Sequence, residues 1–153
     1  MSAPERKPLT RAAVTCAILC ACASPDATPD AEPASADCVE AREHSDLEWI
    51  QDNVFTPSCA VAGSCHRGEA SDAQGLNLEA GVAAAALIEQ PAYGCFGETL
   101  VVPGRPEDSY LMAVFGVYPA GSCRIFLMPF NRAPLCKDKH DAIARWIESL
   151  PAK

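Results

Sequence analysis

The sequence predicts a mainly α-helical domain whose long loops are stapled by disulfide bonds. Apolar residues recur at helical spacing in four segments, and no run shows the alternation of apolar and polar residues that is typical of strands. Six of the nine cysteines lie after residue 37. An even number of cysteines in an exported chain suggests covalent pairing. Together these features indicate helices joined by long, cross-linked loops.

Export is predicted from residues 1–21. Basic residues precede an apolar stretch, residues 12–21, which is too short to span a bilayer, since a span needs about 20 apolar residues, but which fits the core of a signal peptide. The stretch ends Leu19-Cys20-Ala21-Cys22, which resembles a bacterial lipobox. We expect cleavage before Cys22 and lipidation of Cys22, which would anchor the protein in the cell envelope, facing the periplasm or the cell surface. An ordinary secretory signal with incidental cysteines is the alternative.

Residues 22–37 are rich in Pro, Ala, Asp and Ser and contain no large apolar residue, so we expect a disordered tether. The folded domain is then expected over residues 38–153. The whole chain has a formal charge of −8, which makes it a poor candidate for binding nucleic acid, whose phosphates require Lys and Arg. An acidic surface could instead be steered towards a basic redox partner, although general solubility explains most of the charge as well.

The first two helices are expected over residues 45–55 and 78–90. Ser45 and Glu48 form a capping-box pattern at the start of the first, and Pro57 is expected to end it. The second is rich in alanine and is followed by a proline that stops it.

The third helix is expected to open with Pro106 at its first position and to end at Gly116. The fourth covers residues 137–150 and has the clearest amphipathic pattern in the chain. Between them, residues 121–130 are expected to be extended and mostly buried. The residues expected on the buried stripes are Leu111, Met112 and Phe115 in the third helix and Ile143, Trp146, Ile147 and Leu150 in the fourth.

Cys59, Cys65 and His66 form the pattern that carries the chemistry. Two cysteines followed at once by a histidine is typical of a c-type haem, in which the thiols add to the haem vinyl groups and the imidazole binds the iron. The usual motif has two residues between the cysteines, whereas this one has five, Ala60–Ser64. A disulfide at this place is the alternative. A zinc site would need a fourth ligand and protected thiols, which export disfavours.

Met128, followed by Pro129, is the candidate for the sixth iron ligand. A thioether ligand raises the redox potential relative to two histidines. The alternative is that Met128 only fills the core, as most methionines do. His44 and His140 are expected to face solvent, and His140 is a weaker candidate for the ligand. The chain has no phosphate-binding glycine loop and no nucleophile elbow, so we expect an electron carrier and not an enzyme.

A series of short motifs follows in order between Leu47 and Leu150. They are Phe55-Thr-Pro57-Ser-Cys59, Cys65-His66, Gly75-Leu76-Asn-Leu78, Val102-Pro103-Gly104-Arg-Pro106-Glu-Asp-Ser109-Tyr-Leu111, Met128-Pro129 and Trp146-Ile147. This order resembles that of small cytochrome c-like domains in exported proteins of planctomycetes and myxobacteria.

The resemblance implies a cytochrome c-like helical fold in which the first and last helices cross. It also implies one covalent haem c, electron transfer with redox partner proteins of the cell envelope, and a loop at Ala60–Ser64 that bulges away from the haem. The implied contacts of the crossing helices are those of Ile50 and Val54 with Trp146 and Ile147. The implied haem-binding residues are Cys59, Cys65, His66 and Met128, the last two as iron ligands.

Cys95, Cys123 and Cys136 are not needed by the minimal cytochrome fold. Disulfides between them would staple the loops and add about 2–4 kcal/mol each. A domain with that support could keep its fold without haem, so the alternative function is a haem-free, disulfide-stabilised lipoprotein module for binding or structure. A haem enzyme such as a peroxidase has less support, because Met128 would fill the site that peroxide needs. The disulfide candidates are Cys38, Cys95, Cys123 and Cys136.

Overall fold

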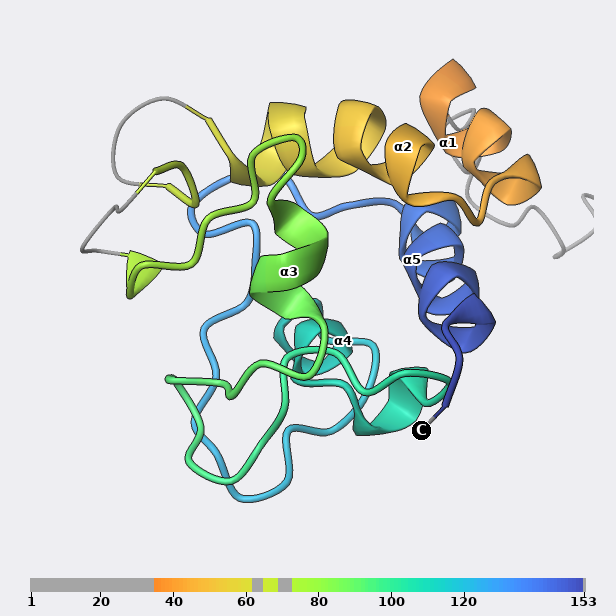
Figure 1. Cartoon of the computed structure of the whole chain (residues 1–153). Coiled ribbons are helices and arrows are strands. Elements are labelled where there is room, and N and C mark those ends of the chain that lie inside the picture. Colours follow the sequence, from red (N-terminus) through yellow and green to blue (C-terminus); the bar gives the residue numbers. More distant parts are fainter. Residues whose placement is uncertain (1–34, 62–64, 69–72, 153) are drawn as a thin grey trace, which may run out of the picture. The chain divides into compact units, whose positions relative to one another are not determined.

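The computed structural model describes residues 35–61, 65–68 and 73–152. They belong to one compact unit, Pro33–Lys153 (Figure 1). The predicted signal peptide, the lipidation site Cys22 and nearly all of the tether lie outside the described residues.

The described part of the chain is mainly helical, as predicted. No strand forms within it, and two isolated β-bridges join Ile88 to Val101 and Pro91 to Thr99. The helical elements, with η marking 3-10 and π turns, are α1 (Ala36–Glu40), η1 (Ala41–Glu43), α2 (Leu47–Ile50), η2 (Gln51–Cys59), α3 (Ala83–Leu87), η4 (Pro106–Asp108), α4 (Tyr110–Val114) and α5 (Lys137–Ser149).

The helix that leads to Cys59 differs from the prediction at both ends. Its cap is Asp46, not Ser45: the Asp46 carboxylate accepts a hydrogen bond from the Trp49 amide at 2.8 Å. The helix also continues past Pro57 to Cys59, in π form over η2. Proline clashes with the carbonyl four residues earlier in an α-helix, and the wider π turn bonds each amide to the carbonyl five residues earlier instead.

The second and third predicted helices are shorter than expected. Helix α3 covers only the middle of residues 78–90, because Gly81 takes a left-handed φ of 84° before it and Ile88 turns extended after it. The third helix is divided at Ser109, whose backbone is extended. The Ser109 hydroxyl accepts a hydrogen bond from the Val102 amide and donates one to the Arg105 carbonyl, both at 2.9 Å. The three residues predicted to be buried in the third helix are all buried: Leu111, Met112 and Phe115.

The main core lies where α2 and η2 pack on α5. Ile50, Val54 and Ile147 are fully buried, and Trp146 is nearly so, within one cluster. The Phe55 ring meets Trp146 edge to face, with 6.5 Å between ring centroids. In Figure 1, α5 descends from α1 and α2. The apolar stripe of α5 was therefore predicted correctly.

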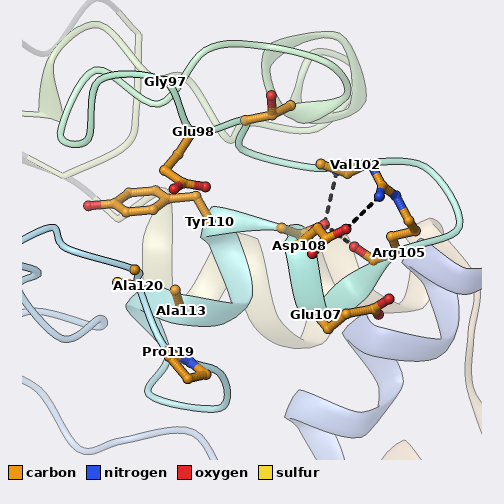
Figure 2. Close-up of a pocket in the computed structure, with 13 residues that line it drawn as sticks. Gly97, Glu98, Val102, Arg105, Glu107, Asp108, Tyr110, Ala113, Pro119 and Ala120 are labelled. Carbon is orange, nitrogen blue, oxygen red and sulfur yellow. Dashed lines mark hydrogen bonds and ion pairs between the residues drawn. The ribbon is translucent and has the colours of Figure 1, made fainter.

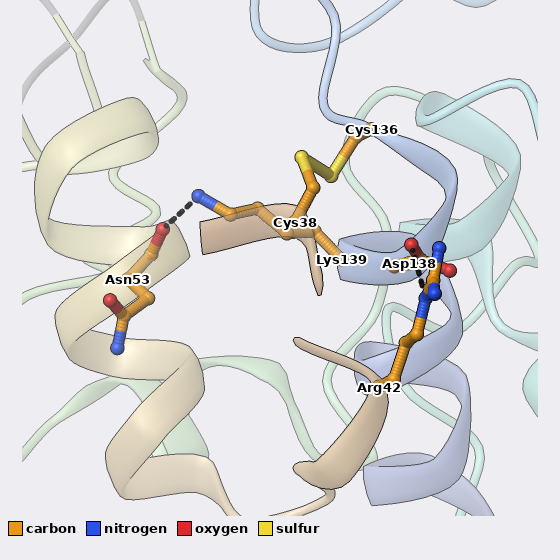
Figure 3. The surroundings of a disulfide bond; sticks show 6 residues. All are labelled: Cys38, Arg42, Asn53, Cys136, Asp138 and Lys139. Carbon is orange, nitrogen blue, oxygen red and sulfur yellow. Dashed lines mark hydrogen bonds and ion pairs between the residues drawn. A yellow bond between two sulfur atoms is a disulfide. The ribbon is translucent and has the colours of Figure 1, made fainter. Parts of the chain in front are cut away.

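A disulfide and polar contacts hold the N-terminal turns on α5. Cys38 bonds to Cys136, which caps α5, and Arg42 pairs with Asp138 at 2.9 Å (Figure 3). On the same end of α5, the Lys139 ammonium donates to a carbonyl of η2 at 3.0 Å. Helix α1 begins at Ala36, two residues before the expected start of the domain.

A second disulfide, Cys95–Cys123, joins the loop after α3 to the loop after α4. The four cysteines predicted as disulfide candidates, which lie outside the Cys59–His66 motif, are thus all paired.

The expectation that residues 121–130 are mostly buried was wrong. Phe126, Leu127 and Phe130 are 67%, 61% and 58% exposed, whereas Met128 is partly buried and Pro129 is buried. The segment is irregular and lies at the edge of a helical core, so it can turn only some of its side chains inward.

Candidate functional site

Cys59 and Cys65 are the free cysteines of the described chain. Cys59 ends η2 and is 7% exposed, while Cys65 is half-buried. Burial, with a smaller contribution from nearby Cys65, raises the pKa of the Cys59 thiol to about 12. Cys59 therefore stays protonated at neutral pH and is a poor nucleophile for disulfide exchange.

A backbone hydrogen bond closes the widened motif on itself. The His66 amide donates to the Cys59 carbonyl at 3.0 Å. The two ends of the loop between the cysteines are therefore close together, as expected for a loop that bulges outward. Within that loop Ala60 is buried and Val61 half-buried, and residues 62–64 lie outside the described residues.

The imidazole of His66 is half-buried, and its Nδ1 atom is buried without a hydrogen-bond partner. Burial lowers the pKa of His66, and a hydrogen-bonding interaction with the Leu76 backbone partly opposes this shift. The ring is therefore neutral at pH 7, which is the state that binds a metal.

Two polar side chains, those of Gln51 and Glu79, hold the segment around His66 in place. Gln51 is buried and donates to the Leu78 carbonyl at 2.9 Å and to the Thr56 hydroxyl at 3.1 Å, while the Leu78 amide donates to the His66 carbonyl. Gln51 was not among the residues predicted for this site. Its place among Leu47, Ile50 and Val54 on one helical face was the signal that could have found it.

Glu79 holds the residues that follow His66. Its carboxylate accepts hydrogen bonds from the Arg67 guanidinium at 2.9 Å and from the Gly68 amide at 3.1 Å. The bond from Arg67, followed by that from Gly68, lowers the pKa of Glu79. Two sets of hydrogen bonds therefore hold residues 65–68: the Leu78 amide bonds to the His66 carbonyl, and the Glu79 carboxylate accepts from the two residues that follow.

Met128 packs against the main core, in the same cluster as Cys59. Its amide donates to the Val114 carbonyl at 2.8 Å, which ties this segment to the end of α4. Phe126 and Phe130 flank it and meet edge to face, with 6.1 Å between ring centroids.

The expectation that His140 faces solvent was wrong, whereas His44 is partly exposed. His140 is half-buried, its Nε2 is buried without a partner, and its ring stacks on Phe115 at 5.4 Å. The reason is its register, because His140 continues the buried stripe of α5. His44 stacks on Trp49 at 4.6 Å and bonds to Asp46 at 3.0 Å, and its side chain is 29% exposed.

A polar pocket of about 350 Å³, which was not predicted from the sequence, lies beside η4 and α4 (Figure 2). In it Arg105 pairs with Asp108 at 2.7 Å. Glu98 lies near Tyr110, and burial followed by this carboxylate raises the pKa of Tyr110. No cysteine or histidine lines the pocket, and the buried hydroxyl of Ser109 already makes two hydrogen bonds. The pocket is therefore separate in chemistry from the Cys59–His66 motif.

Among the described residues, no group of three or more His, Cys, Asp and Glu side chains is placed to hold a metal ion. No helix in the described part of the chain is long and apolar enough to cross a membrane.

Comparisons of the chain with protein-family models, with curated proteins and with solved structures find no match.

Proposed function

We propose that this chain is an exported, lipid-anchored c-type cytochrome domain that carries electrons between proteins of the cell envelope. One observation carries the proposal: the four cysteines outside the motif are paired, whereas Cys59 and Cys65 inside it are free and adjoin His66. Two thiols and a neutral imidazole are the set that a covalent haem requires.

The thiols suit covalent attachment. Each would add across one haem vinyl group, so that the sulfur bonds to one vinyl carbon and the thiol proton passes to the other. This addition needs no oxidant. When bound, the haem supplies a one-electron redox couple.

His66 would bind the iron through one ring nitrogen. Its other nitrogen then lies on the protein side, where a backbone group can orient it, as is usual for metal-bound histidines. The pKa effect of the Leu76 backbone supports that arrangement. The remaining task of these residues is to hold the ring still, which Gln51 and Glu79 support through the segments on either side.

Met128 is proposed as the second protein ligand that would bind the haem iron. The exposed apolar side chains beside it support this role, because a haem needs apolar surroundings that shield it and set its potential. Phe126, Leu127 and Phe130 provide such a surface next to a methionine that turns inward.

The partners and the location follow from the sequence and belong to the same proposal. Lipidation at Cys22 would attach the domain to a membrane, and the acidic chain would favour a redox partner with a basic surface. Cys22 lies outside the described residues.

The test is expression in a host that matures c-type cytochromes, followed by extraction with acidic acetone. Haem absorbance that stays with the protein is expected, and Cys59→Ser with Cys65→Ser should abolish it. The matched control, Cys95→Ser with Cys123→Ser, should keep it. A colourless wild-type protein would contradict the proposal. A count of free thiols then separates the haem-free alternatives: two unreacted thiols fit the free cysteines seen here, and none would mean that Cys59 and Cys65 pair.

A further inference from the structure

Two buried side-chain nitrogens in the described chain lack a hydrogen-bond partner, and both belong to histidines: Nδ1 of His66 and Nε2 of His140. A buried polar atom without a partner costs free energy, so each such atom in a native protein calls for an explanation. The proposed function explains His66. It leaves His140 without a role.

The position of His140 makes the cost plain. It lies on α5 three residues before Ile143 and seven before Ile147, both fully buried, so that the ring occupies a place on the apolar stripe. Its contact there is with the Phe115 ring, at 5.4 Å between centroids and 25° between planes. An aliphatic side chain would fill this position without burying a nitrogen.

The end of α4 connects His140 to the Met128 segment. Phe115, on which His140 stacks, follows Val114, whose carbonyl accepts the Met128 amide at 2.8 Å. Gly116 comes next, with a φ of 75°, and Leu127 approaches so closely that a Cβ there would lie 3.3 Å from its methyl group. Residues 114–116 therefore contact both His140 and the predicted ligand loop.

We propose that His140 is an alternative iron ligand to Met128, and that its Nε2 would bind the iron of a haem held by this chain when Met128 is absent. The inference rests on the proposed function, because it needs a haem held by Cys59, Cys65 and His66. Neutral imidazole is a good ligand for iron, and two histidines give a lower potential than histidine with methionine. The Nε2 atom of His140 would then be an alternative iron ligand to the Met128 thioether.

The experiment uses the haem-loaded protein and three variants, Met128→Leu, His140→Phe, and the double variant. Spin state by absorption and electron paramagnetic resonance, and the midpoint potential, are measured. Met128→Leu is expected to stay low-spin with a lowered potential. The double variant should become high-spin and recover a low-spin spectrum when imidazole is added.

Two outcomes would overturn the inference: a Met128→Leu protein that is already high-spin, or a double variant that stays low-spin without added imidazole. Both leave the proposed function standing, since haem is still attached. A wild-type protein without haem would remove both proposals. His44→Phe combined with Met128→Leu is the matched control, and it should keep the low-spin spectrum.

The haem-free protein gives a second readout. In it, His140→Leu should raise the urea midpoint, because it replaces a buried nitrogen without a partner by apolar surface. His44→Leu should lower the midpoint, because it removes the bond to Asp46. A fall in the midpoint for His140→Leu would mean that the imidazole serves the fold itself, and would also overturn the inference.

Discussion

Removing the Cys38–Cys136 disulfide should cost more stability than removing Cys95–Cys123, because it closes the longer loop. The bonds join cysteines 98 and 28 residues apart in the sequence. In the chain-entropy model a cross-link destabilises the unfolded state by an amount that grows with the logarithm of loop length. The model gives about 4.7 kcal/mol for the outer bond and about 3.6 kcal/mol for the inner one.

The inner bond shortens the path that the outer bond closes, because Cys95 and Cys123 both lie between Cys38 and Cys136. Subtracting the inner loop lowers the outer contribution to about 4.4 kcal/mol. The thermodynamic cycle lowers the loss on removing the inner bond by the same amount, to about 3.3 kcal/mol, so the expected difference between the two bonds is about 1.1 kcal/mol. Contacts other than the disulfide should keep the folded geometry of the N-terminal turns, since Arg145 donates to the Ala41 carbonyl at 2.7 Å.

The assay is urea unfolding of the double variants Cys38→Ala with Cys136→Ala and Cys95→Ala with Cys123→Ala. Fluorescence of the buried Trp49 and Trp146 reports the loss of the core. An equal or larger loss for the inner bond would refute the loop-length reasoning. It would mean that the native contacts of the loop after α3 decide the cost.

Two further predictions concern single side chains near the motif. Gln51→Leu should lower the free energy of unfolding by about 1–3 kcal/mol, because the buried Leu78 carbonyl loses its side-chain donor. Thr56→Val is its control in urea unfolding and should cost less, since Gln51 keeps Leu78; an equal loss would contradict the role given to that carbonyl. Asp46→Ala should cost about 1 kcal/mol through the lost helix cap. Hydrogen bonds from His44 and Trp49 lower the pKa of Asp46, so its contribution is present above the pKa of the unfolded carboxyl and is lost as pH falls through the folded value. Asp46→Asn should keep the cap and flatten this acid limb of the stability curve, and a limb that stays unchanged would show that another carboxyl dominates it.

Helix α5 could be predicted almost to the residue because one uninterrupted stripe decides it. Ile143, Trp146 and Ile147 are buried as expected, and the helix ends at Ser149, before Pro151. The same stripe places His140 inside the core. The polar residue type of His140 suggested a solvent-facing position, but its spacing from Ile143 and Ile147 places it on the buried face of the helix.

The form of η2 could not be read from the sequence. Apolar spacing along the first helix predicts a helix with one buried face, but it does not distinguish an α from a π turn. Pro57 suggested an end, whereas the wider turn carries the chain on to Cys59. The result depends on packing against α5 and on the Gln51 bonds to Leu78, which join residues far apart in the sequence.

Cysteine parity predicted cross-linking, but neither the number of disulfides nor the pairs. Six cysteines allow fifteen connectivities of three bonds, and an arrangement with two bonds and two free thiols is a further possibility. The structure brings Cys38 to Cys136 because α1 and α5 pack together, and Cys95 to Cys123 because two loops share the small cluster around Tyr110 and Ala113. These neighbours come from the tertiary fold and not from local sequence.

The free pair gives the widened motif its significance. In an oxidising compartment, neighbouring thiols are expected to be oxidised unless something else uses or protects them. Burial protects Cys59 by keeping it protonated, but Cys65 is more exposed and one residue from the imidazole of His66. If the export prediction holds, a covalent ligand is the simplest use for two such thiols. The spacing of five residues does not oppose this, because the bond from the His66 amide to the Cys59 carbonyl already brings the ends of the loop together.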